Sequence, residues 1–227
     1  MADPIFQYGA LPSMGLRITP ESAIDIDHDG DFDVFSIDIN GNVLFSRNTG
    51  NAVNPSFASP QTNPFGLTGM GNGAEGTFSD IDSDGDLDAF IGQYAGTLQF
   101  FRNIGTRTNP QFAAPQPNPF GLNMGTNGAP NPTLVDIDGD NDMDAFVGNY
   151  GGDILFFKNT GTPQNPAFAA ADNNPFGFDL VNFSITTYIN PTFVDIDGDG
   201  DLDAFIGWSG FYGSGNWFFR NIGTPHD

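Results

Sequence analysis

Residues 195–203 read D-I-D-G-D-G-D-L-D, so nine consecutive residues of this chain carry five carboxylates. Carboxylates this close together repel one another strongly unless a cation lies between them. A tight turn at the sixth residue, Gly200, allows the carboxylates of positions one, three and five to point inward. The carbonyl oxygen of position seven and the carboxylate of position nine then complete a shell made only of oxygen. Calcium prefers such a shell, whereas soft metals prefer Cys or His, so this stretch predicts a calcium site.

The same nine-residue pattern occurs three more times, at residues 25–33, 80–88 and 136–144. Position six is Gly in two of these copies and Asn141 in the third, and Asn readily adopts the left-handed backbone for a residue other than Gly. Four copies are a much more specific signal than one. We therefore predict four Ca²⁺ sites, whose candidate ligands are Asp25, Asp27, Asp29, Asp31, Asp33, Asp80, Asp82, Asp84, Asp86, Asp88, Asp136, Asp138, Asp140, Asp142, Asp144, Asp195, Asp197, Asp199, Asp201 and Asp203.

The 227 residues include 28 acidic and 6 basic side chains, which gives a net charge of −22. Twenty of the acidic residues lie in the four loops, so the negative charge is concentrated at the predicted metal sites. A chain this acidic disfavours binding to nucleic acid or to anionic membranes. No run of 18 apolar residues is present, so we predict no membrane insertion. The start, Met-Ala-Asp-Pro, lacks the basic and apolar regions of a signal peptide, so none is expected.

The four loops recur every 55 to 59 residues, a period typical of propellers and arrays. In each repeat a short apolar segment enters the loop and a second segment leaves it, as in Ala89-Phe90-Ile91. A third follows a Gly-containing hairpin, and a fourth is expected around Phe57, Phe112 and Phe168. Four short antiparallel strands per repeat are typical of a propeller blade. The sequence therefore predicts an all-β fold, a four-bladed β-propeller of four-stranded antiparallel blades in a single domain covering residues 1–227.

The two ends of the chain predict how the ring closes. The second and third repeats continue after the third strand as Asn109-Pro110-Gln111-Phe112 and Asn165-Pro166-Ala167-Phe168, whereas the fourth stops at Asp227. A matching segment, Asp3-Pro4-Ile5-Phe6, occurs near the other end. We expect this N-terminal strand to complete the last blade. Exchange of the same strand between two molecules is the alternative, so both a monomer and a homodimer remain open.

These loops, placed between the first two strands of a repeated four-strand unit, resemble the FG-GAP/VCBS repeats of integrin α-subunit propellers and related microbial propellers. The family pattern Asp-x-Asp/Asn-x-Asp-Gly-x-x-Asp is matched in all four loops, apart from Asn141. The resemblance implies calcium ligands at positions one, three, five and nine and a carbonyl ligand at position seven. Some members are lectins. Members usually have seven blades. With four repeats, this chain could also form half of an eight-bladed propeller made by two chains. EF-hands are excluded, because the acid expected at position twelve is missing.

In such a blade the loops of strands one and two lie on one face, and the hairpins of strands two and three lie on the other. Four basic residues at the end of strand three, Arg47, Arg102, Lys158 and Arg220, are expected to pair with the loop carboxylates. The Phe of the repeated Asn-Pro-Phe-Gly motif is expected to pack between blades. Aromatic residues beside amides on the hairpin face suit a sugar ring, so candidate ligand-binding residues are Tyr94, Tyr150, Trp208, Tyr212 and Trp217. The competing interpretation is a surface for self-association.

An enzyme is not expected. The chain has two His residues and no Cys, and neither His has a repeated neighbour that could serve as nucleophile or orienting acid. We predict an extracellular or cell-surface binding and adhesion module, stabilised by calcium, with carbohydrate or an extracellular protein as partner. Extracellular calcium modules bind at about 0.1–1 mM, a concentration that only the outside of a cell supplies steadily. A purely structural or self-assembling repeat domain is the alternative, and a carbohydrate-active enzyme the third.

Overall fold

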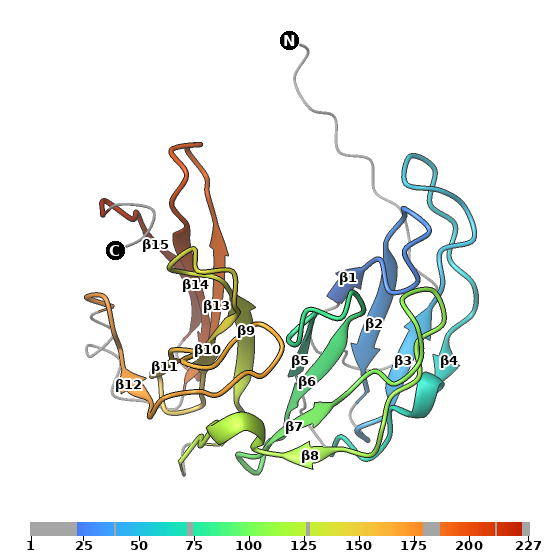
Figure 1. Cartoon of the computed structure of the whole chain (residues 1–227), viewed down its shortest axis with the longest axis horizontal. Helices are drawn as coiled ribbons and strands as arrows, with labels where there is room; N and C mark the ends of the chain where they lie inside the picture. Colours follow the sequence, from blue (N-terminus) through green and yellow to red (C-terminus); the bar gives the residue numbers. More distant parts are fainter. Residues whose placement is uncertain are drawn as a thin grey trace.

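The computed structural model describes residues 22–38, 40–71, 75–125, 128–178, 187–211 and 213–223. They form an all-β structure of four antiparallel sheets arranged as the blades of a propeller (Figure 1). The predicted N-terminal closing strand at residues 3–6 lies outside the described residues. No helix in the described part of the chain is long and apolar enough to cross a membrane.

Each of the first three blades is a meander of four strands. Blade 1 consists of β1 (Ser22–Ile24), β2 (Asp33–Ile37), β3 (Val43–Ser46) and β4 (Gln61–Thr62). Blade 2 consists of β5 (Glu75–Ser79), β6 (Asp88–Gly92), β7 (Leu98–Phe101) and β8 (Gln116–Pro117). Blade 3 consists of β9 (Asn131–Val135), β10 (Asp144–Gly148), β11 (Ile154–Phe157) and β12 (Asp172–Asn173).

Blade 4 differs from the others in strand number and length. Within the described residues it has three strands, β13 (Thr187–Val194), β14 (Asp203–Gly210) and β15 (Gly213–Phe219). The longer β14 and β15 carry the insertion that contains both tryptophans, so the hairpin of this blade extends beyond those of its neighbours (Figure 1).

The core lies between consecutive blades. The first strands contact one another in chain order, β1 with β5, β5 with β9, and β9 with β13. Strands β2, β6 and β10 are buried along their whole length, and β6 and β10 have a neighbouring blade on each side. At Gly92 a Cβ atom would lie 1.6 Å from the carbonyl oxygen of Pro130, so only glycine permits this approach of blade 3 to blade 2. Phe-rich clusters lie in the three spaces between blades.

The fourth strand is not where the sequence predicted it. Phe57, Phe112 and Phe168 form only isolated bridges with Asn48, Asn103 and Asn159, and the fourth strands β4, β8 and β12 begin four residues further along. Two features shorten the ladder. A proline two residues before each Phe has no N–H to donate. The N–H of the residue between them bonds to an Asn side chain, as Gln111 does to Asn103 (3.0 Å), instead of to a strand carbonyl.

The repeated Asn-Pro-Phe-Gly motif forms a tight turn after the fourth strand, seen as η1 (Pro64–Gly66) and η2 (Pro119–Gly121). Asn63 and Phe65 both adopt positive φ, and the Asn63 side chain accepts a hydrogen bond from the Val43 N–H (2.9 Å). Phe65 packs edge-on against Phe45 with ring centroids 5.0 Å apart. Phe120 and Phe176 make the equivalent contact in blades 2 and 3. Phe65 and Phe120 also pack against the clusters between blades, as the sequence predicted, whereas Phe176 is 66% exposed.

Candidate metal centre

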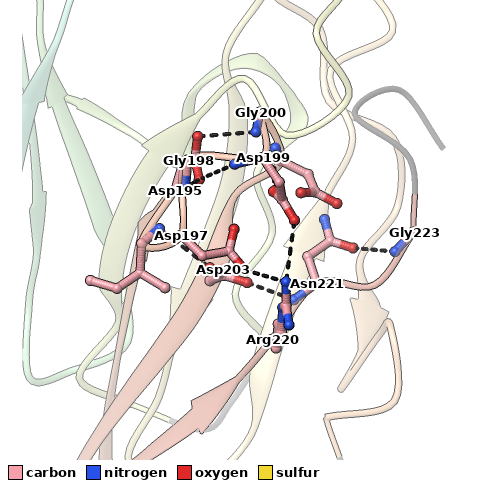
Figure 2. Close-up of polar contacts among 11 residues, drawn as sticks. Asp195, Asp197, Gly198, Asp199, Gly200, Asp203, Arg220, Asn221 and Gly223 are labelled. Carbon is pink, nitrogen blue, oxygen red and sulfur yellow. Dashed lines mark hydrogen bonds and ion pairs between the residues drawn. The ribbon is translucent and has the colours of Figure 1, made fainter.

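The four acidic loops fold alike. In the loop of blade 4, the Asp195 carboxylate accepts hydrogen bonds from the backbone N–H groups of Asp199 (3.2 Å) and Gly200 (3.1 Å) (Figure 2). The corresponding two bonds occur in the other three loops. The sixth residue has positive φ in every loop, including Asn141 at 70°, which is the conformation that the sequence pattern predicted.

This turn gathers the carboxylates of positions one, three and five. In each loop, one carboxylate oxygen from each of the three residues lies within 4.8 Å of the others. The four groups are Asp25, Asp27 and Asp29; Asp80, Asp82 and Asp84; Asp136, Asp138 and Asp140; and Asp195, Asp197 and Asp199. Three negative oxygens this close define a position where a cation could be held.

The Asp of position nine is held by the end of the third strand. Asp88 is 2% exposed, and one of its oxygens accepts the backbone N–H of Asn103 at 2.6 Å. Its other oxygen is buried and has no hydrogen-bond partner among the described residues. Asp33 and Asp144 likewise have one oxygen bonded to an Asn backbone N–H and one buried oxygen without a partner among the described residues. Asp203 differs, because its second oxygen accepts a long bond from Ile196 (3.3 Å).

Burial raises the pKa of these position-nine carboxyls. The pKa is about 7 for Asp88 and Asp144 and about 6 for Asp33, although the backbone hydrogen bond opposes the shift in each case. At position seven, burial raises the pKa of Asp86 to about 6, with neighbouring loop carboxylates adding to the effect. A cation bound beside these carboxyls would favour their charged form and oppose this rise in pKa.

The basic residues at the end of strand three pair with the loops, as the sequence predicted. Arg47, Arg102, Lys158 and Arg220 each contact the position-three Asp of their own blade. Asp27 and Asp82 thereby use one oxygen for the guanidinium, while the other is buried without a partner among the described residues. A partly exposed guanidinium satisfies one side of the carboxylate and leaves the other side facing the loop centre.

One group of residues was missed by reasoning from the sequence. Asn48, Asn103 and Asn159 are almost fully buried. Besides donating to the position-nine Asp, each accepts two backbone N–H groups on its side-chain oxygen, which for Asn103 come from Gly105 and Gln111 (both 3.0 Å). The recurrence of Asn directly after each basic residue was the available signal.

We expect Asn103→Ala to lower the free energy of unfolding by about 1–3 kcal/mol, because two backbone N–H groups lose their acceptor. Asn103→Asp keeps the acceptor oxygen and should cost less. Urea unfolding measures both, with Asn173→Ala on the exposed strand β12 as control. Equal, small effects of all three substitutions would contradict this role of Asn103.

A second candidate site lies at the hairpin ends of the blades, opposite the acidic loops. Glu75, Asn131 and Asn190 occupy the same register position on the first strands of blades 2, 3 and 4, where each pairs with a glycine. With Tyr188 and Trp208 they line a cavity of about 320 Å³. Burial raises the pKa of Glu75. Glu75, Asn131, Asn190 and Tyr188 were not among the predicted site residues, because only the fold brings these strands together.

The predicted aromatic residues divide into two groups on this face. Tyr94 and Tyr150 lie with ring centroids 6.2 Å apart, and Tyr150 continues to Tyr188 at 4.7 Å. Trp208 lines the cavity and is stacked on Trp217, with centroids 5.5 Å apart and planes inclined by 21°. Tyr212 lies outside the described residues.

Comparison with known families agrees with the loop geometry. The family model of the FG-GAP-like repeat matches residues 25–91 and 80–147, which together cover more than half of the chain. The chain belongs to the FG-GAP-like repeat family. Each match begins at a position-one Asp and ends in the second strand of the following blade, so the family unit includes the acidic loops described above. No curated protein gives a significant match.

Proposed function

We propose that this FG-GAP-like propeller is a calcium-stabilised, non-enzymatic binding module that works outside the cell and takes carbohydrate as its ligand. The observation that carries the calcium assignment is the set of buried carboxylate oxygens, on Asp27, Asp33, Asp82, Asp88 and Asp144, that have no partner among the described residues. Burying a carboxylate oxygen that has no partner is unfavourable, and a cation at the loop centre would compensate for that cost.

The donors in each loop fit calcium. They are all oxygens, and calcium accepts six to eight oxygen ligands in a variable geometry, whereas Mg²⁺ demands near-octahedral geometry. The side chains of positions one, three, five and nine, with the carbonyl of position seven, would hold the ion. Its charge would neutralise the loop, and its bonds would tie the ends of the first and second strands together. Sites of this kind fill at about 0.1–1 mM calcium, which favours an extracellular location.

The ligand assignment rests on the chemistry of the cavity at the hairpin face. Trp208 offers a flat apolar face on which the C–H groups of a sugar ring can stack. Glu75, Asn131 and Asn190 offer acceptors and donors for hydroxyl groups, and Tyr188 adds a phenol. One aromatic wall with several amides suits an uncharged polyhydroxy ligand better than an apolar one.

We expect Trp208→Ala to weaken carbohydrate binding at least about tenfold, because it removes the stacking surface. Glu75→Gln should weaken binding less, since the amide keeps one acceptor. Phe211→Ala is the matched control, an aromatic residue 87% exposed in the blade 4 hairpin that does not line the cavity. A glycan array followed by calorimetric titration in calcium measures these effects. Absence of binding by the parent protein would leave a structural role for the propeller and overturn the ligand assignment.

A further inference from the structure

A cavity of about 390 Å³ lies between blades 3 and 4, on the side of the acidic loops. Six phenylalanines contribute to its lining: Phe146, Phe156, Phe176, Phe178, Phe193 and Phe219. The corresponding spaces between the earlier blades contain Phe112 and Phe168, which are 5% and 8% exposed. Phe112 lies 6.2 Å from Phe78, the residue of blade 2 that corresponds to Phe193 of blade 4. The cavity is therefore the blade 4 counterpart of a position that holds a phenylalanine in blades 2 and 3.

Three backbone contacts hold that phenylalanine segment in blade 2. The N–H of Gln111 donates to the Asn103 side chain (3.0 Å), and the N–H of Ala113 donates to the carbonyl of Arg102 (2.8 Å). The N–H of Phe112 crosses to the preceding blade and donates to the carbonyl of Phe65 (2.8 Å). Blade 3 repeats all three contacts at Ala167, Ala169 and Phe168, and blade 1 shows the first two at Ser56 and Ala58.

Blade 4 presents the same acceptors. The Asn221 side-chain oxygen accepts the Gly223 N–H at 3.0 Å, as its counterparts do, but within the described residues it has no second donor (Figure 2). The carbonyls of Arg220 and Phe176, counterparts of Arg102 and Phe65, likewise accept no backbone bond from the described part of the chain. Polar groups of this kind are normally paired in a folded protein.

The apolar surface around these acceptors is also open. Phe176 is 66% exposed, whereas its counterparts Phe65 and Phe120 are half-buried. Phe218 is 51% exposed, whereas its counterpart Phe45 is 1% exposed. Exposed aromatic surface next to unused acceptors indicates an edge to which an extended segment can bind.

We propose that this cavity is a binding site for residues 3–6 of the chain, with the Phe6 ring in the cavity. The segments bound in blades 1 to 3 read Asn-Pro-Ser-Phe, Asn-Pro-Gln-Phe and Asn-Pro-Ala-Phe, and residues 3–6 read Asp-Pro-Ile-Phe. In this arrangement the N–H of Ile5 would donate to the Asn221 side chain, that of Phe6 to the Phe176 carbonyl, and that of Gln7 to the Arg220 carbonyl. Pro4 needs no acceptor and limits the conformations that the segment loses on binding.

The test uses the absence of cysteine from the chain. In blade 2, Ile104 and Gln111 lie opposite each other, joined by a bond of 2.7 Å from the Ile104 N–H to the Gln111 carbonyl. The equivalent pair in blade 4 is Ile222 and Ile5, and Ile222 is 89% exposed. Cross-strand neighbours lie within the range of a disulfide. We expect the full chain carrying Ile5→Cys and Ile222→Cys to form an intramolecular disulfide on mild oxidation.

The matched control combines Ile5→Cys with Ile104→Cys, because Ile104 is the same repeat position with its partner site filled by Gln111. The intramolecular product should exceed the control by about tenfold or more, as expected for a high local concentration. Adding Phe6→Ala to the Ile5/Ile222 pair should return it to the control level, while circular dichroism of the reduced protein checks that it folds. A covalent dimer on non-reducing gels would assign the site to a second copy, and no product above the control would rule out the segment. Either result overturns the proposal.

Discussion

Removal of calcium is expected to lower the melting temperature of this protein by at least about 20 °C. A ligand present at a hundredfold its dissociation constant stabilises the folded state by about 2.7 kcal/mol per site, and the chain has four loops. For a domain of this length, 1 kcal/mol shifts the melting temperature by roughly 2–4 °C. Differential scanning calorimetry in about 10 mM calcium, a hundredfold a dissociation constant of about 0.1 mM, and after exhaustive chelation measures the difference. An unchanged melting temperature after chelation would refute calcium-linked stability.

A calorimetric titration with calcium can count the sites. Asp84→Ala removes the proposed position-five ligand of blade 2, so calorimetric titration should give three calcium ions per chain instead of four. Asp172→Ala is the matched control, because this exposed Asp lies on β12 outside every loop. Magnesium at the same concentration should stabilise the protein less than calcium, since it dehydrates reluctantly and needs a more regular ligand geometry.

The sequence alone predicted those features that depend on local spacing. The loop conformation follows from alternating Asp with a left-handed residue at position six, and both properties can be read within nine residues. The pairing of the basic residues was also predictable, because Arg102 and Asp82 recur at a constant offset of 20 residues in three blades. Because the same offset recurs in successive repeats, the sequence alone can indicate a contact between residues that are far apart in the chain.

Features that depend on the assembly of different blades could not be predicted. Glu75 appeared as an isolated acid in the sequence, yet the propeller places it with Asn190 and Trp208, more than a hundred residues away, around one cavity. The fourth strand was misplaced because strand propensity marks the apolar Phe112. The Asn103 side chain and the strand carbonyls compete for the N–H of Gln111, and the side chain wins. That outcome depends on how residues 109–112 fold back, which the sequence does not show.

The stability of this protein is expected to change with pH in opposite directions with and without calcium. The metal-free fold holds Asp88 and Asp144 with pKa values of about 7 and Asp33 and Asp86 with values of about 6, whereas an unfolded Asp has a pKa of about 3.9. Between these values the folded state binds more protons than the unfolded state. The free energy of unfolding of the metal-free protein should therefore fall as pH rises from about 4 to about 7.

Calcium reverses this dependence, because it binds the ionised carboxylates and competes with protons for them. The stabilisation by calcium should be largest near pH 8 and should shrink as the pH falls through about 7 and 6. Melting curves of metal-depleted protein, with and without added calcium, measure the two profiles across this range. Parallel profiles would show that the loop carboxyls do not exchange protons for calcium.

Asp88→Asn separates the two effects at one site. The amide keeps the oxygen that accepts the Asn103 N–H but cannot become charged. Without calcium, the variant should be more stable than the parent near pH 8, where the parent carries a buried charge, and should match it near pH 5, where Asp88 is protonated. With calcium, the variant should be the less stable protein near pH 8, because the ion loses its position-nine carboxylate. A substitution that stabilises the metal-free fold and destabilises the loaded one would mean that Asp88 is retained for the cation, at a cost to the stability of the metal-free protein.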